Sequence, residues 1–202
     1  MLLAIDTSVG TSVAIVDRDL GTLAVASSPD TRGHAELIGV LIDECLRDSG
    51  IAVTELSGVV AGMGPGPFTG LRVGIAAARA FAFGTGVPVV PLASHDAVAF
   101  GEDEPIVVTT DARRRELFYS VYSGSDDAGL PLRVEGPALA KAEGFVAPAG
   151  HHLIHATSID AASLGHLAET WYAVGRPFPA DEPLYLRSPD VTISAGPKRV
   201  TG

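Results

Sequence analysis

Residues 62–86 read GMGPGPFTGLRVGIAAARAFAFGTG, a turn rich in glycine and proline that leads into a long apolar segment. Glycine permits positive φ and close backbone approach, whereas proline fixes φ and lacks an N–H donor. An apolar run at 58–61 precedes the turn, so the pattern predicts strand, stiff turn and helix. We expect the helix to cover 69–83, with Thr69 as its N-cap and Gly84 as its end.

The turn has two possible interpretations. Free N–H groups at a helix N-terminus attract anions, so a phosphate could bind there. The sequence satisfies neither G-x-x-x-x-G-K-[ST] nor G-x-G-x-x-G, however, which are the usual phosphate-binding patterns. The alternative is a rigid corner that fixes the direction of the helix.

The helix itself is apolar on nearly every side, with only Arg72 and Arg79 charged. A ridge of small side chains recurs at every fourth position: Gly70, Gly74, Ala78 and Ala82. Such a ridge allows another backbone to approach closely. One side of the helix can cover a sheet, and the other side needs a second cover. That cover is either a partner polypeptide or the second half of this chain.

Apolar patterning and short connections predict the remaining elements. The expected strands are 2–5, 12–16, 20–27, 58–61, 87–92, 106–110, 117–122, 132–135 and 153–155. The expected helices are 34–48, 69–83, 94–100 (capped by Ser94) and 161–174. Three antiparallel strands followed by α/β alternation, given twice, describe a two-lobed α/β fold of the actin-like ATPase (ASKHA, ribonuclease-H-like) class. The polar stretch 101–105 predicts a first lobe at 1–101 and a smaller second lobe with a C-terminal tail at 102–202.

Composition narrows the function. The 202 residues carry a formal net charge of -10, which argues against independent binding to nucleic acid. The arginines at 113–115 are too few to form a nucleic-acid patch on such a chain. The single cysteine, Cys45, lies among apolar neighbours and is expected to be a buried structural residue, with a catalytic thiol as the alternative. The N-terminus does not read as a signal peptide, and no segment reads as membrane-spanning, so we expect a cytoplasmic protein.

Several motifs together resemble the TsaB family of bacterial tRNA-modifying proteins. GPGPFTGLRVG is similar to the family signature GPGSFTGLRIG, and MLLAIDTSVGTSVAIV resembles its opening strand pair. DARRRELFYSVY is similar to its DAR-x-x-E-V-Y strand entrance, and EPLYLR to its E-P-x-Y-L-R close. These matches run in family order from Met1 to Arg187 and are weakest over 126–180.

The resemblance implies a subunit required for threonylcarbamoylation of the adenosine next to the tRNA anticodon. In that family the paralogue TsaD transfers the group from threonylcarbamoyl-adenylate, TsaB pairs with TsaD through its first-lobe helices, and the ATPase TsaE joins them. TsaB itself is a non-catalytic paralogue of TsaD. The resemblance therefore implies TsaD-type and TsaE-type partners and tRNA contact only through the complex. It also implies that ATP and magnesium are used by the complex and not bound firmly by this chain.

We expect the partner to contact residues on the two first-lobe helices. The predicted set is His34, Leu37, Ile38, Leu41, Thr69, Gly70, Arg72, Val73, Gly74, Ala77, Ala78 and Phe81. An uncovered apolar face would also let the isolated chain form a homodimer.

A nucleotide site in this chain is the alternative, as in a stand-alone actin-fold ATPase or kinase. Asp6, Thr7 and Thr11 occupy the turn that meets phosphate in actin-like ATPases, and Asp6 could hold magnesium through water. No matching phosphate turn is found in the second lobe. A second polar group is expected beside the cleft between the lobes, either to hold the lobes in register or to bind a ligand: Asp111, Arg113 and Glu116.

A metallopeptidase-like protein is the third hypothesis. TsaD holds a metal with a His-x-x-x-His pair, but here Ile38 stands four residues after His34. A lone histidine at a helix start is expected to be a surface or capping residue. His151 and His155 have the i, i+4 spacing of a helical metal pair, yet with His152 they lie in a predicted loop and strand without a clear third ligand. We expect structural or solvent-exposed roles for them, and no metal site.

Overall fold

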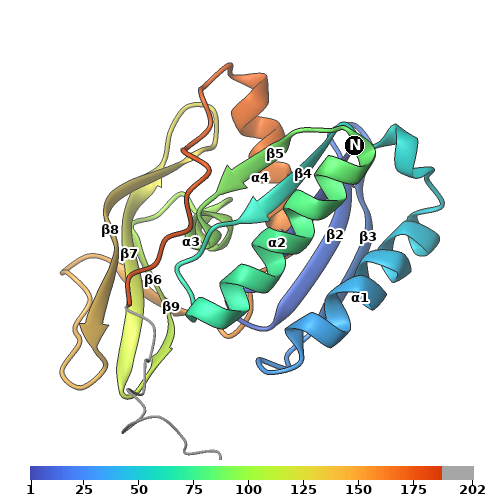
Figure 1. Ribbon diagram of the computed structural model, residues 1–202. Coiled ribbons are helices and arrows are strands. Elements are labelled where there is room, and N and C mark those ends of the chain that lie inside the picture. The colour runs from blue at the N-terminus through green and yellow to red at the C-terminus, as the bar shows by residue number, and fades with distance from the viewer. Residues whose placement is uncertain (188–202) are drawn as a thin grey trace, which may run out of the picture.

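Residues 1–187 are described by a computed structural model, in which two β-sheets lie side by side with helices around the first (Figure 1). The first sheet has the order β3-β2-β1-β4-β5. Its strands are β1 (Leu2–Asp6), β2 (Thr11–Asp17), β3 (Gly21–Ser28), β4 (Gly58–Gly62) and β5 (Val89–Leu92). The first three strands form the antiparallel meander that the short connections predict. β4 pairs parallel to β1, and β5 pairs parallel to β4.

The second sheet has the order β8-β7-β6-β9. Its strands are β6 (Ile106–Arg113), β7 (Glu116–Ser125), β8 (Pro131–Lys141) and β9 (His152–His155). β8 is much longer than the four residues predicted at 132–135. Gly136 and Pro137 discourage a strand in the sequence, but β8 stays paired with β7 on both sides of them through an irregular register.

Two helices cover one face of the first sheet, α1 (His34–Ser49) and α2 (Phe68–Thr85). The other face is covered by α4 (Ala161–Ala173). Because side chains alternate along a strand, Leu3 and Ile5 of β1 pack toward α1 and α2, whereas Ala4 packs toward α4. α4 lies so close that a Cβ at Gly165 would lie 2.6 Å from a methyl carbon of Val16. No helix within residues 1–187 is long and apolar enough to cross a membrane.

The predicted boundary after residue 101 separates the two sheets but does not separate the packing. α4 follows the second sheet in sequence and nevertheless packs on the first. The segment 181–187 also returns to the first lobe, where the Leu184 N–H donates to the Met63 carbonyl oxygen at 2.8 Å. Figure 1 shows this segment, in red, passing beside α2 toward β6 and β7. The rest of the predicted tail, 188–202, lies outside the described residues.

Three predicted helix ends are wrong. α2 begins at Phe68 after Pro67, whose φ is -59°, so Thr69 lies inside the first turn and is not the N-cap. The helix also continues through Gly84 to Thr85, and Gly86, which has the left-handed φ of 75°, caps its end. Ser94 does not cap the short helix α3 (Ser94–Ala99), because Ala93 precedes it and the Ser94 hydroxyl binds Asp6 instead.

Candidate functional site

The ridge of small residues on α2 packs inside the protein, which contradicts its predicted use by a partner. The Thr7 hydroxyl, at the end of β1, donates to the Gly70 carbonyl oxygen at 2.8 Å and accepts from the Gly74 N–H at 3.1 Å. The backbone that approaches the ridge therefore belongs to this same chain. Gly70, Gly74 and Ala78 are buried and cannot contact another polypeptide in this conformation.

Three α1 residues of the predicted partner surface are buried as well. Ile38 and Leu41 belong to the core between α1 and the first sheet. His34 is 7% exposed, and its Nδ1 is hydrogen-bonded to the Thr11 hydroxyl at 2.8 Å. The expectation that His34 is a surface or capping residue is wrong, because this bond ties the start of α1 to β2. Burial lowers the pKa of His34, which favours the neutral ring.

The accessible part of the predicted partner surface is smaller than the set expected from sequence. Its exposed or half-buried members are Leu37, Thr69, Arg72, Val73, Ala77 and Phe81. Arg72 and Arg79 are partly engaged by the tail segment: Arg72 donates to the Tyr185 hydroxyl at 3.3 Å, and Arg79 forms an ion pair with Asp181 at 2.8 Å.

Sequence reasoning missed further exposed apolar side chains on the same two helices. Val40 on α1 is 60% exposed and Phe83 on α2 is 92% exposed. Ala76 and Ala80 are also exposed on α2. For the α2 residues the spacing carries the signal, since Ala76, Ala80 and Phe83 fall on the side of the helix away from the buried Leu71 and Ile75.

The Asp6 turn is closed by internal hydrogen bonds. Asp6 is 1% exposed; its Oδ1 accepts from the Ser8 N–H at 2.8 Å and the Ser8 hydroxyl at 2.5 Å, and its Oδ2 accepts from the Ser94 hydroxyl at 2.5 Å. Burial raises the pKa of Asp6, although these bonds oppose the shift. Thr7 and Thr11 are buried with internal partners too. This geometry does not fit the predicted magnesium and phosphate roles of the three residues.

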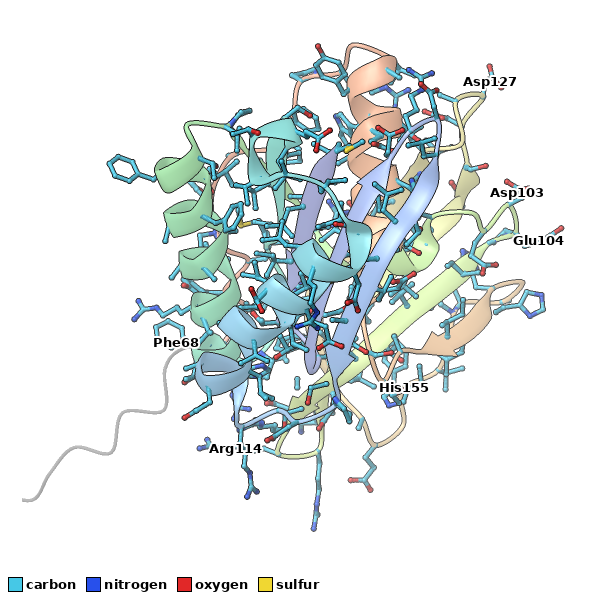
Figure 2. All side chains as sticks on the ribbon, turned by 90° about the vertical axis from the view of Figure 1, so that its right-hand side faces the viewer. Phe68, Asp103, Glu104, Arg114, Asp127 and His155 are labelled. Atoms are coloured by element: carbon cyan, nitrogen blue, oxygen red, sulfur yellow. The ribbon has the colours of Figure 1, made fainter. Side chains whose placement is uncertain are left out.

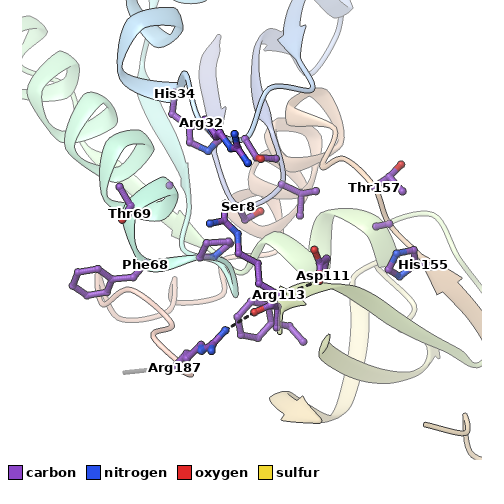
Figure 3. A pocket seen from close by; sticks show the side chains of 17 residues that line it. Ser8, Arg32, His34, Phe68, Thr69, Asp111, Arg113, His155, Thr157 and Arg187 are labelled. Carbon is purple, nitrogen blue, oxygen red and sulfur yellow. Dashed lines mark hydrogen bonds between the residues drawn. The ribbon is translucent and has the colours of Figure 1, made fainter. Parts of the chain in front are cut away.

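A cleft of about 640 Å³ opens between the two lobes (Figure 3). Its polar lining comes from both lobes: Ser8, Thr31, Arg32, His34, Thr69, Asp111, Arg113, His155, Thr157 and Arg187. Of the residues predicted beside the cleft, Asp111 and Arg113 line it. Glu116 does not, and forms an ion pair with Arg187 at 3.8 Å. Arg187 also donates to the Ala112 carbonyl oxygen at 2.8 Å, so the tail is bound to the second sheet at the edge of the cleft.

The β6–β7 hairpin turns through three consecutive left-handed residues. Arg113, Arg114 and Arg115 have φ values of 63°, 54° and 62°. Each costs roughly 1–2 kcal/mol for a residue that has a Cβ. The Asp111 carboxylate accepts from the Arg113 N–H at 2.8 Å and so supports the first of them. Figure 2 shows the Arg114 side chain extending away from the body of the protein. Nothing in the sequence indicates this backbone, since the usual glycine or asparagine is missing.

A buried polar network behind the cleft was also missed. The His95 ring is hydrogen-bonded to the Ser120 hydroxyl at 2.9 Å and to the Thr110 hydroxyl at 3.0 Å. Burial lowers the pKa of His95 to about 3, so the ring is neutral. The next residue, Asp96, accepts from the Tyr122 hydroxyl at 2.7 Å. These bonds join α3 to the second sheet.

The histidines at 151–155 do not form a metal pair. His152 and His155 lie in β9 and His151 in the loop before it, so the helical i, i+4 geometry is not formed. The His155 ring is hydrogen-bonded to the Thr109 hydroxyl at 3.1 Å. Across the described residues, no group of three or more histidine, cysteine, aspartate or glutamate side chains is arranged to hold a metal ion.

Comparison with known proteins matches residues 26–151 to the TsaD family, described as tRNA N6-adenosine threonylcarbamoyltransferase. The chain belongs to this family. Over most of its length it is similar to proteins named TsaB and YeaZ. The structure of YeaZ from Pseudomonas aeruginosa superposes with a TM-score of 0.77 at 24% identity, covering 92% of this chain and 99% of that one. Together with the family match, this likeness confirms the predicted α/β actin-like fold.

Sequence relatives of this TsaB-like protein differ in length. An uncharacterized Mycobacterium tuberculosis protein is 36% identical over 197 residues, which cover 94% of this chain and 92% of that protein. A Mycobacterium leprae protein is 38% identical over 143 residues, but the match spans only 38% of its length and 69% of this chain. The Escherichia coli protein named tRNA threonylcarbamoyladenosine biosynthesis protein TsaB is 26% identical over 199 residues, covering 96% of this chain and 81% of that protein.

Proposed function

We propose that this TsaB-like protein is a non-catalytic subunit required for threonylcarbamoylation of the adenosine next to the tRNA anticodon. The similarity to the Escherichia coli protein named tRNA threonylcarbamoyladenosine biosynthesis protein TsaB supports the pathway, and the closed Asp6 turn supports the non-catalytic role. In an actin-like fold this turn would have to reach a nucleotide, but here its carboxylate is buried and all its oxygens accept bonds from protein donors. A TsaD-type partner would then carry the chemistry, with a TsaE-type ATPase. ATP, magnesium and tRNA would be bound by the assembly, which would locate the protein in the cytoplasm.

The proposed partner surface is the outer side of α1 and α2. It retains the accessible members of the predicted set and adds the exposed Val40, Ala76 and Ala80. Apolar side chains left on the surface of a helix gain free energy when a partner covers them, about 25 cal/mol per Å². In the absence of TsaD the same surface would support a homodimer.

Pairing is tested by mixing the purified chain with its TsaD homologue and measuring mass by size-exclusion chromatography with light scattering. We expect a heterodimer, and we expect the double variant Ala76→Glu, Ala80→Glu to weaken it at least about tenfold, because two carboxylates would be desolvated in the interface. The matched control is Tyr172→Glu on α4, a residue that is 77% exposed on the opposite side of the first sheet. Substitutions at Gly74 or Ala78 would disturb the core and are unsuitable.

The activity is tested by reconstitution with TsaD and TsaE homologues, tRNA, threonylcarbamoyl-adenylate, ATP and magnesium. We expect the modified nucleoside, detected by mass spectrometry, only when this chain is present. Equal modification without the chain, or turnover of ATP by the purified chain alone, would contradict the proposal.

A further inference from the structure

The cleft carries positive charge in a strongly acidic protein. The chain has a formal net charge of -10. Yet three arginines, Arg32, Arg113 and Arg187, line the cleft against one acidic residue, Asp111. Arg187 is paired with Glu116, so the two remaining arginines less Asp111 leave a formal charge of +1 among the arginine and aspartate side chains of the lining. A local charge opposite to that of the whole chain concentrates anions there.

Two of the three guanidinium groups are not used by the fold. Arg187 is occupied, because it donates to the Ala112 carbonyl oxygen and pairs with Glu116. Arg32 and Arg113 use only their backbone N–H groups, which donate to Asp30 and Asp111. Within residues 1–187 neither guanidinium forms an ion pair or a side-chain hydrogen bond. Each therefore keeps five N–H donors for a ligand.

The two free arginines come from opposite sides of the cleft. Arg32 lies just before α1 in the first lobe, and Arg113 lies at the tip of the β6–β7 hairpin in the second (Figure 3). Burial is the main cause of the low pKa of His34, and the positive charge of Arg113 lowers it further. The Arg113 charge thus acts across the cleft on a first-lobe residue. A ligand between the lobes would be within reach of both.

The remaining lining suits an organic anion. α2 begins at Phe68 without a side-chain cap and opens onto the same cleft, which adds partial positive charge. Phe68 and Phe118 contribute apolar surface beside the polar residues. The volume of about 640 Å³ lies within the usual range for small-molecule sites, roughly 300–1,000 Å³.

We propose that the cleft is a metal-independent binding site for a small phosphate-bearing anion, held between the guanidinium groups of Arg32 and Arg113. Planar guanidinium groups bind phosphate oxygens in pairs of parallel hydrogen bonds. The two guanidinium groups supply two positive charges for an anion that lies between them. The site lies beside the Asp6 turn, which contributes Ser8 to the lining, but it does not involve the Asp6 carboxylate, which accepts only protein donors. The proposal goes beyond the assembly role and is independent of it.

The test uses the purified full chain in EDTA, without any partner. Pyrophosphate and ADP are titrated by isothermal calorimetry at low ionic strength. We expect saturable binding at one site, weakened at least about tenfold by Arg32→Gln and by Arg113→Asn, since each substitution removes a guanidinium group that forms charge-assisted hydrogen bonds with phosphate. Asparagine is chosen at 113 because it tolerates positive φ. The two probes distinguish the possible ligands. Equal affinities for pyrophosphate and ADP would show that the site recognises only the phosphates, and tighter binding of ADP would show that it recognises a nucleotide. Either result supports the proposal.

The matched control is Arg47→Gln, near the C-terminal end of α1, where the guanidinium pairs with Asp43 and Asp48 away from the cleft. The affinity of Arg47→Gln for both probes should equal that of the unsubstituted chain. Thermal unfolding should show that all variants are folded. Three results would overturn the proposal: no binding of either probe, an equal loss in Arg47→Gln, or binding that requires magnesium. Binding of an RNA oligonucleotide but of neither small probe would overturn it as well.

Discussion

Gly74 lies directly against the side chain of Thr7: a Cβ at Gly74 would lie 2.3 Å from the Thr7 hydroxyl oxygen and 2.9 Å from its methyl carbon. The contact joins the end of β1 to the first turns of α2. The side chain of Thr7 fills the space that any other residue at 74 would need, and its hydroxyl accepts the N–H of the same residue.

Gly74→Ala should therefore lower the free energy of unfolding by about 1–3 kcal/mol, the usual cost of overpacking a core. The matched control is Gly84→Ala in the same helix, where an added Cβ meets nothing within 4 Å. That change should raise the free energy of unfolding by up to about 1 kcal/mol, because glycine is a poor helix former. Urea denaturation followed by circular dichroism measures both. Equal effects of the two substitutions would contradict the packing described for Thr7.

The bonds of Asp6 should be energetically coupled to Ser94. Asp6→Asn replaces an acceptor of three bonds with a group that is half donor, and Ser94→Ala removes one of the donors. We expect each to lower the free energy of unfolding by about 1–3 kcal/mol. The double variant should lose less than the sum, with a coupling energy of about 0.5–3 kcal/mol. Asp43→Asn on the exposed side of α1 is the control and should change little. Strict additivity would show that the Asp6–Ser94 bond is not formed.

His95 should make the protein less stable in mild acid. Its pKa is lowered by burial to about 3 in the folded protein, whereas the unfolded chain titrates near its ordinary value of 6.5. Between these values the unfolded state binds the proton and the folded state does not, so stability falls as pH falls, by at most about 1.4 kcal/mol per pH unit.

Asp6 and Asp96 change the stability with pH in the opposite direction, because burial raises the pKa of each carboxyl group. The comparison that isolates His95 is therefore the unsubstituted chain against His95→Gln, by denaturation between pH 4 and about 7. We expect the free energy of unfolding of His95→Gln to fall less steeply as the pH is lowered. The control His152→Gln, at an exposed position in β9, should show the same pH dependence as the unsubstituted chain. Parallel curves for the unsubstituted chain and His95→Gln would refute the assignment.

Cys45 should be unreactive until the protein unfolds. It is buried on the inner side of α1, its thiol donates to the Val13 carbonyl oxygen at 3.3 Å, and burial raises its pKa to about 11. The thiolate that attacks labelling reagents is therefore scarce near neutral pH. We expect a thiol reagent to label the native protein far more slowly than the protein in guanidinium chloride, as followed by mass spectrometry. Fast labelling of the native protein would contradict the burial.

Apolar patterning and turn signals predicted a strand or long helix near each observed one, although β8 is much longer than the predicted strand at 132–135. The apolar spacing in α1 and α2 indicates that one face of each helix is buried, so the core residues on both helices could be predicted. It does not report which chain covers the face, because Gly70 and Gly74 suit the Thr7 backbone of the same molecule as well as a partner. The destination of α4 could not be predicted for a related reason. Element order does not say which of two sheets a later helix covers.

The candidate site was predicted only in part. Asp111 and Arg113 were expected beside the cleft because a polar group at a strand start is visible in the sequence. The bond between Ser94 and Asp6 was not, since the two residues lie 88 positions apart in the sequence. Arg32 and Arg187 were missed as cleft residues because each lies in irregular structure, where no periodicity fixes the direction of a side chain. The left-handed backbone at 113–115 carries no sequence signal.

The position of α4 has a consequence for synthesis on the ribosome. The first sheet is complete once β5 has been made, but the helix that covers its second face ends roughly 80 residues later. At translation rates of about 5–20 residues per second, that face stays uncovered for about 4 to 16 seconds. Ala4, Val16 and Val60 would be exposed to other nascent chains during this interval. The N-terminal half is therefore a natural client for chaperones that bind at the exit tunnel, even though the finished protein buries the same surface completely.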